Sequence, residues 1–220
     1  MALGEQFVVH VDGIYRKTED VEVGGYVLSP TLRAQQRAVA EEEREEGHLE
    51  EAEEAREFAE LRGVLPNSAT ETYTLGAGFA LINEGGSLGA SVSYFDSRYG
   101  IPARPGEEGE EDHEEEEEGH KEHGEAPVPI DLKQYRADLR GELFTEGFLE
   151  KIKFRAGFSD YQHTEFEGDE VGTVFKTQGF ETRLELVQAN RNGWRGVTGF
   201  QGSTRDFAAV GAEAFVPPNV

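Results

Sequence analysis

The sequence contains no cysteine, and only one methionine and one tryptophan occur among its 220 residues. Without cysteine, disulfide bonds and thiolate metal sites are excluded. No apolar run approaches the ~20 residues that a transmembrane helix needs. The first residues, MALGEQF, lack the basic start and the apolar stretch of a secretory signal peptide, so no export signal is expected within this sequence.

Basic residues are also scarce, because 21 Lys and Arg stand against 45 Asp and Glu, for a net charge of −24. Two runs carry most of the excess: residues 41–60 contribute −9 and residues 107–125 contribute −11. Subtracting both runs from −24 leaves −4 for the rest of the chain. Nucleic acid is not an expected partner, since binding it requires Lys and Arg to neutralise phosphates. Cations fit the charge better.

What the sequence does contain is β-strand alternation, clearest from Gln134 to Tyr161. Two arms flank the polar break 145–147. One face would carry Tyr135, Ala137, Leu139, Gly141, Leu143, Ile152, Phe154, Ala156 and Phe158. The other would carry Gln134, Arg136, Asp138, Arg140, Glu142, Lys151, Lys153 and Arg155. This pattern predicts a β-hairpin. A face with charges of both signs is typical of a membrane β-barrel wall, although a soluble sheet with one solvated face alternates in the same way.

Similar patterning predicts seven strands in all. The other five are Phe7–Arg16, Thr70–Ile82, Ser87–Ser97, Val174–Gln188 and Trp194–Arg205. The intervening connections are long, short, long, short, medium (residues 162–172) and short, and residues from 206 onward are expected to be a loop. Alternating long and short connections favour an up-and-down barrel with short turns at one edge.

We therefore predict an all-β fold, an antiparallel up-and-down meander of about seven long strands forming part of a transmembrane β-barrel. Bacterial barrels use an even number of strands, about 8 or more, and seven is odd. Either the pattern misses one strand or the chain is a middle portion of a larger barrel, and the missing export signal favours the second interpretation. Residues 17–69 and 98–129 would form long extracellular loops. The first is rich in Ala, Glu, Gln and Arg without proline over 32–62, which predicts an acidic helix or helix pair.

The second loop contains the candidate metal site. Its run EEGEEDHEEEEEGHKEHGE offers the ligands Asp112, His113, His120, Glu122 and His123. Imidazole together with carboxylate suits zinc and neighbouring divalent cations. The alternative is a solvated acidic loop whose histidines are incidental. Zinc or another divalent cation is expected here as a transported ligand, and no resident cofactor is expected.

A second, smaller set of polar residues is His10, Asp12 and His163. His10 and Asp12 would share the lumen-side face of the first strand, where a ligand path would run; the alternative is that all three are ordinary polar residues of the lumen wall. The charged ladders of the later strands are expected to be structural. The sequence has no G-x-S-x-G, HExxH or phosphate-binding glycine loop. We therefore do not expect an enzyme.

Several segments resemble TonB-dependent outer-membrane receptors. They are PNSATETYTLGAGFAL (66–81), SYFDSRYGIP (93–102), PIDLKQYRADLRGEL (129–143), RAGFSDYQHTEFEGDEVGTVFKTQGFETRLEL (155–186) and GWRGVTGFQGSTRDFAAVGAEAFVPP (193–218). The most similar branch takes up metal ions and is called zinc-receptor-like. In that branch the loop that follows the segment matching Ile101 and Pro102 is commonly rich in histidine and acids.

The resemblance implies a signal peptide, a TonB box, a plug domain and a barrel of about 22 strands. Residues 1–220 would then be an internal barrel fragment that lacks the plug and the terminal strands, in the bacterial cell outer membrane. Implied partners are outer-membrane lipid, the TonB system through the missing plug, and a metal ion or metal chelate, with zinc the first candidate. Two alternatives remain: an iron-siderophore receptor of the same family, or a soluble acidic β-sheet protein that buffers cations or binds a partner.

Overall fold

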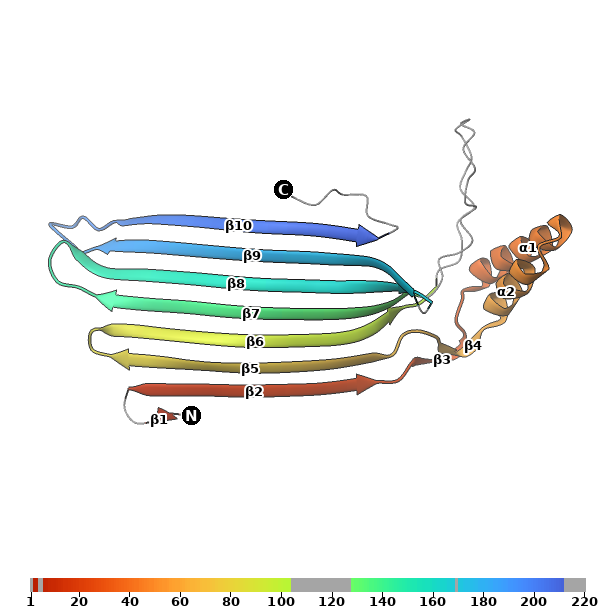
Figure 1. Ribbon diagram of the computed structural model, residues 1–220, viewed down its shortest axis with the longest axis horizontal. Helices are drawn as coiled ribbons and strands as arrows, with labels where there is room; N and C mark the ends of the chain where they lie inside the picture. The colour runs from red at the N-terminus through yellow and green to blue at the C-terminus, as the bar shows by residue number, and fades with distance from the viewer. Residues whose placement is uncertain (1, 4–5, 104–127, 169, 212–220) are drawn as a thin grey trace, which may run out of the picture.

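The protein is described by a computed structural model that covers residues 2–3, 6–103, 128–168 and 170–211. A single antiparallel sheet dominates it (Figure 1). In spatial order its strands are β1 (Ala2–Leu3), β2 (Phe7–Thr18), β5 (Thr70–Asn83), β6 (Gly86–Ile101), β7 (Val128–Phe144), β8 (Leu149–Glu167), β9 (Glu170–Gln188) and β10 (Val197–Gly211). From β2 onward each strand pairs with the next strand of the sheet along the chain, so the predicted all-β meander of seven long strands is confirmed.

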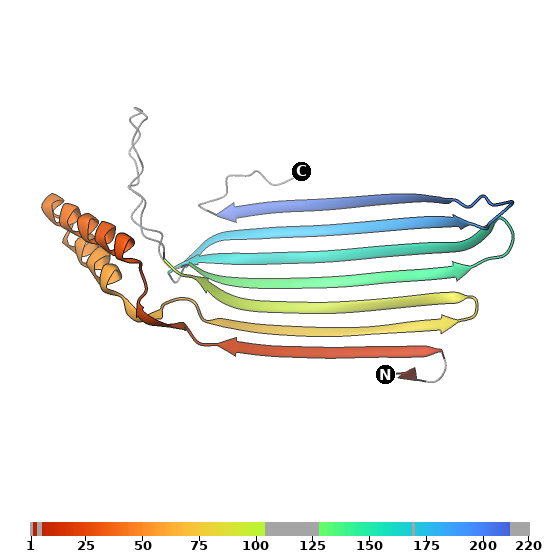
Figure 2. The same cartoon turned by 180° about the vertical axis from the view of Figure 1, so that it is seen from behind.

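The connection between β2 and β5 contains a helical hairpin. Strands β3 (Val21–Tyr26) and β4 (Arg62–Leu65) form its base, and helices α1 (Pro30–Glu46) and α2 (Leu49–Glu60) project from one end of the sheet (Figures 1 and 2). The predicted acidic helix pair is therefore confirmed. Within the described residues, no helix is both long and apolar enough to cross a bilayer.

Local signals fix the ends of α1. Ser29 accepts a hydrogen bond from the backbone N–H of Leu32, and Pro30 occupies the first helical turn, where its missing N–H costs nothing. Gly47 ends the helix at φ 94°, a left-handed conformation that glycine adopts without steric cost. Between the helices Ala52 and Ala59 are buried. Gln36 and Glu43 of α1 are buried as well, so the contact combines small and polar side chains and is not a broad apolar stripe.

Several boundaries differ from the sequence prediction. The predicted loop 162–172 is wrong for most of its length, because β8 continues to Glu167 and β9 starts at Glu170. The predicted loop from residue 206 is wrong up to Gly211, where β10 ends. In both segments the alternation of apolar and polar residues fades, but the backbone ladder between neighbouring strands continues. Strands β1, β3 and β4 were not predicted.

The sheet is not closed within the described residues, since β10 has β9 as its partner and β1 forms the other edge. Hardly any side chain is sequestered from solvent. The buried hydrophobic residues of the described part are Ala52, Ala59, Ile130, Val187 and Ala209. The three short β-turns or loops after β5, β7 and β9 lie at the end opposite the helices (Figure 1).

Candidate functional site

The cross-strand register separates the sheet into an apolar face and a polar face. Residues directly opposite each other in a ladder point to the same side, and the ladders bring apolar residues of seven strands together. We call the following side chains the apolar band: Phe7, Val9, Val11, Leu75, Ala77, Phe79, Leu81, Leu88, Ala90, Val92, Ala137, Leu139, Ile152, Phe154, Ala156, Phe158, Phe180, Leu184, Leu186 and Phe200. The band lies open to solvent, with exposed fractions of 74% for Val11, 59% for Val92 and 66% for Phe200.

Tyrosines bound this band at the end nearest the helices. Tyr15 lies opposite Tyr73, and Tyr94 lies opposite Tyr135, each pair with ring centroids 4.8 Å apart. The hydroxyl groups of Tyr15 and Tyr73 both donate to the Glu71 carboxylate, at 3.1 and 2.7 Å. Each ring therefore joins the apolar band to a charged zone, as aromatic residues do at a membrane–water interface.

At the opposite end of the band, aromatic side chains occur in the turns. Phe148, between β7 and β8, is 58% exposed, and Trp194, between β9 and β10, is 83% exposed. The band therefore has aromatic residues at both ends. In β2 the span from Phe7 to the bounding Tyr15 is nine residues, which matches the ~9–11 residues of a transmembrane strand.

The polar face carries charges in rows that run across the strands. One row alternates in sign, with Glu142 opposite Lys153 and Lys153 opposite Glu185. Glu142 also pairs with Lys151, at 3.2 Å. The prediction that charged ladders are structural fits this row, because opposite charges on neighbouring strands contribute about 0.2–1 kcal/mol per pair.

The next row is different, because Arg140, Arg155 and Arg183 face one another across β7, β8 and β9. Like charges directly opposite are destabilising. Within the described residues Arg183 pairs with Glu185 at 2.7 Å, whereas Arg140 and Arg155 make no ion pair. We call these three residues the arginine row.

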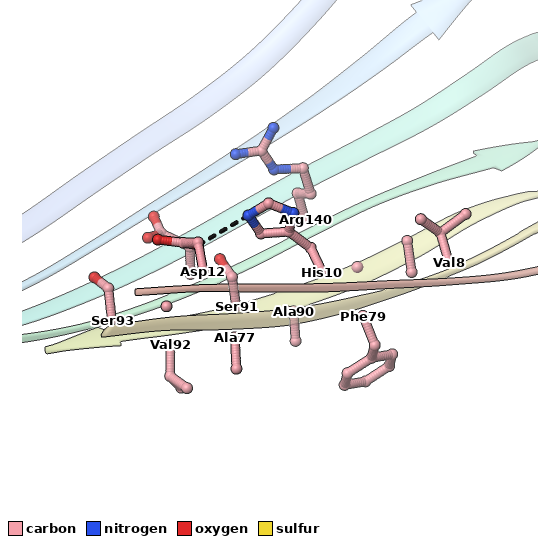
Figure 3. Close-up of a pocket in the computed structure, with 15 residues that line it drawn as sticks. Val8, His10, Asp12, Ala77, Phe79, Ala90, Ser91, Val92, Ser93 and Arg140 are labelled. Carbon is pink, nitrogen blue, oxygen red and sulfur yellow. Dashed lines mark hydrogen bonds and ion pairs between the residues drawn. The ribbon is translucent and has the colours of Figure 1, made fainter. Parts of the chain in front are cut away.

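A shallow hollow lies on the polar face where β2, β5 and β6 meet, next to His10 and Asp12. His10 Nε2 and Asp12 Oδ1 are 2.8 Å apart, and both side chains are exposed. The neighbouring Gly76 lies beneath the Asp12 carboxylate, where a larger side chain would collide with it. Figure 3 shows His10, Asp12 and Arg140 on one side of the sheet and Phe79 and Val92 on the other.

His163, the third residue of that predicted set, does not join the other two. It lies on β8, three strands away from β5, where its ring stacks on Phe175 at 4.5 Å and its Nδ1 is 2.8 Å from the Tyr161 hydroxyl. His10 and Asp12 alone offer two ligands, fewer than the three protein ligands of a catalytic zinc site. They could orient a polar ligand but do not form a metal centre by themselves.

The predicted metal ligands Asp112, His113, His120, Glu122 and His123 lie outside the described residues. The structure does reveal another group with metal-ligand chemistry, at the turn between α1 and α2. Glu43, Glu46 and His48 each offer a ligand atom, and these atoms all lie within 4.8 Å of one another. His48 Nδ1 is 2.7 Å from Glu43 Oε2, so the turn already orients the imidazole.

Ion pairs also hold the base of this hairpin. Arg33 donates to the Ala59 carbonyl at 2.8 Å and to Glu60 at 3.1 Å, and Arg37 pairs with the same Glu60 carboxylate. The hydrogen bond from Arg37 lowers the pKa of Glu60 below its ordinary value, and the Glu60 carboxylate in turn raises the pKa of Arg37. The Arg33 guanidinium lies over the Tyr26 ring, 3.2 Å from its centroid.

The arginine row and the Glu43–Glu46–His48 group were both missed by sequence reasoning. The signal for the first is the position of Arg140, Arg155 and Arg183 relative to the two turns that join their strands. The signal for the second is the spacing of Glu43, Glu46 and His48 around the helix-ending Gly47.

Comparison with known proteins gives no relative: no family model matches the chain, and no curated protein matches it.

Proposed function

We propose that the chain is part of the barrel wall of a TonB-dependent receptor in the bacterial outer membrane, which takes up a metal ion or metal chelate. The observation that carries this proposal is the apolar band, which crosses seven strands without any protein layer over it within the described residues. Contiguous exposed apolar surface of this extent is rare on soluble monomers and marks an interface with protein or membrane.

Lipid explains the dimensions of the band better than a protein partner does. A barrel wall has an apolar belt ~25 Å tall with aromatic girdles at both edges. Nine residues at ~3.3 Å each, tilted by ~35–45° as barrel strands are, rise roughly 21–24 Å, a height close to that of the belt with one girdle included. The Tyr15–Tyr73 and Tyr94–Tyr135 pairs would form one girdle, and Phe148 with Trp194 would belong to the other.

The opposite face would then line the lumen. Its charges of both signs, and the small residues beside His10 and Asp12, are compatible with a water-filled or plugged interior. The role proposed is transport and not catalysis. The helical hairpin would lie outside the cell, since it projects from the end opposite the three short turns.

Zinc remains the first candidate for the cargo. The Glu43–Glu46–His48 group supports a divalent cation, because imidazole and carboxylates are ligands that zinc accepts. The same group also favours the second candidate function, a soluble acidic β-sheet protein that buffers cations. An iron-siderophore receptor is the alternative within the same family, and the Glu43–Glu46–His48 group does not favour it over zinc.

Site-directed spin labelling tests the membrane part of the proposal. The chain has no cysteine, so single cysteines introduced from Gln134 to Leu143 on β7 can be labelled one at a time. In liposomes, labels at Tyr135, Ala137 and Leu139 should collide preferentially with oxygen, which concentrates in lipid. Labels at Arg136, Asp138 and Arg140 should collide preferentially with a water-soluble nickel chelate. No alternation, together with a monodisperse chain in detergent-free buffer, would favour the soluble candidate.

A further inference from the structure

The arginine row has no counterpart of opposite charge across the strands. In the neighbouring row Glu142, Lys153 and Glu185 alternate in sign, as a purely structural wall would require. Arg140 and Arg155 instead face each other without an ion pair to any described residue. Three like charges on adjacent strands carry a cost that the described part of the protein offsets only at Arg183.

A hollow of ≈ 560 Å³ lies over this row. Gly157 and Gly179 have no side chains to fill it, and Ser159 and Ser203 fill little of it. Five arginines line the hollow against two acids: Arg136, Arg140, Arg155, Arg183 and Arg205 against Asp138 and Glu181. The lining therefore has a net charge of +3, in a chain whose net charge is −24.

The spacing of the arginines favours a ligand with several anionic groups over a ligand with one. Directly opposite residues have Cβ atoms ~4.5–5.5 Å apart, so two neighbouring guanidinium groups can reach a single small molecule. A guanidinium binds a carboxylate or phosphate group through two parallel hydrogen bonds. A monocarboxylate satisfies one such group, whereas a tricarboxylate or a diphosphate can engage two or three.

We propose that the arginine row is a binding site for a small multivalent oxyanion of the carboxylate or phosphate class. The proposal goes beyond the proposed function and does not depend on it, because it requires only that Arg140, Arg155 and Arg183 share one face of the sheet. A soluble sheet with this register would bind the same ligand.

Isothermal titration calorimetry on the full 220-residue chain in an uncharged detergent tests this proposal. The probes are citrate, pyrophosphate and acetate at low salt. Citrate and pyrophosphate should bind at least about tenfold more tightly than acetate, and added NaCl should weaken both. The variant R140Q/R155Q/R183Q should lose roughly a factor of ten for each charge-assisted contact removed.

A matched control removes the same number of positive charges elsewhere. The variant R98Q/K133Q/R195Q changes two residues near the strand ends closest to the helices and one in the connection between β9 and β10. All three lie outside the hollow, so this variant should keep citrate affinity within a few-fold. If it loses as much affinity as R140Q/R155Q/R183Q, general electrostatics accounts for binding and the site does not exist.

A second variant works in the opposite direction and does not rely on loss of binding. D138N/E181Q raises the net charge of the lining from +3 to +5 and should tighten citrate binding. Far-UV circular dichroism establishes that each variant keeps its strands. Unchanged or weaker binding by D138N/E181Q, or wild-type affinity in R140Q/R155Q/R183Q, overturns the proposal.

Discussion

The helical hairpin and the sheet treat burial in opposite ways. The hairpin has few apolar side chains, yet it buries Ala52 and Ala59 at its inner contact and fixes Arg33 to the Ala59 carbonyl. The sheet is rich in Phe, Leu and Val, yet it leaves them open, with Phe79 54% exposed and Leu75 60% exposed. The polar hairpin therefore buries its own contact, whereas the apolar face of the sheet stays exposed within the described residues.

This difference shows where each region must obtain its stability. Burying a large apolar side chain contributes about 1.5–3 kcal/mol, and the sheet realises little of this within the described residues. The apolar band can gain this stability only when lipid or another protein surface buries it. The hairpin depends on short-range contacts and ion pairs that need no cover. The two regions should therefore respond to different perturbations.

The largest expected effect comes from a charge in the apolar band. Val92→Arg places a guanidinium at the middle of the band, where it would cost about 2–4 kcal/mol if the cover is lipid. The fraction of chain that inserts into liposomes should fall sharply. Ser91→Arg, one residue away on the polar face, is the matched control and should insert like the wild type. Equal loss in both variants would contradict the assignment of the two faces.

A smaller effect, on the unfolding free energy of the sheet, is expected from a substitution of Gly86, which follows the β5–β6 turn. Gly86 has φ 146°, which other residues rarely adopt, and a Cβ there would collide with the Glu142 carbonyl oxygen. Gly86→Ala should destabilise the sheet by about 1–3 kcal/mol, measured by urea unfolding in micelles.

The control for this turn is Gly157→Ala. The nearest atom to a Cβ at Gly157 is Asp138 Oδ1 at 3.6 Å, an ordinary contact, so the change in unfolding free energy should be small. The helical circular dichroism signal of the hairpin should be unaffected by either variant. A loss of helix in Gly86→Ala would mean that the two regions unfold together.

The sheet was predictable from the sequence wherever one face is apolar. Strand β7 alternates strictly from Tyr135 to Leu143, so its existence and its faces follow from period-two patterning. Beyond the band both faces are polar, as at Gln162 and His163, and the pattern there is no longer distinguishable from a loop. The missed ends of β8 and β9 have this cause.

The arginine row could not be predicted because residues 162–172, which join β8 to β9, were expected to be a loop. The turn near 145–147 already places Arg140 opposite Arg155, but placing Arg183 requires the register of β8 with β9. That register depends on the tight turn at Gly168, whose φ is 61°, and an eleven-residue loop at 162–172 leaves it undefined. The Glu43–Glu46–His48 group likewise depends on where α1 ends.

A third prediction concerns metal at the hairpin. Zinc should stabilise α1 and α2 through Glu43, Glu46 and His48, by about 1.4 kcal/mol at ten times the dissociation constant. The readout is the thermal midpoint of the far-UV helical signal with and without zinc. His48→Ala should abolish the shift, whereas Glu50→Gln, an exposed acid on α2, should leave it intact. An unchanged shift in His48→Ala would remove this group as a zinc ligand set.

The smallest expected effect is the pH response of the Glu60 ion pairs. Because the pKa of Glu60 is lowered in the folded state, its contribution is fully present above its ordinary value of 4.5 and is lost as the pH falls through the lowered pKa. The Glu60 and Arg37 side chains are 44% and 53% exposed, and the Arg33 side chain is 14% exposed, so the contribution is modest and should shrink in high salt. Protonation of the other glutamates acts in the opposite direction, because it relieves their mutual repulsion along α1 and α2.

The contribution of Glu60 is therefore measured as a difference between the wild type and Glu60→Gln. Acidification below pH 4.5 should bring the helix stability of the wild type toward that of Glu60→Gln. Parallel pH curves for the two chains would show that the pairs of Glu60 with Arg33 and Arg37 contribute nothing to hairpin stability, which would then rest on contacts that do not involve Glu60, such as the Arg33 bond to the Ala59 carbonyl and the buried Ala52 and Ala59.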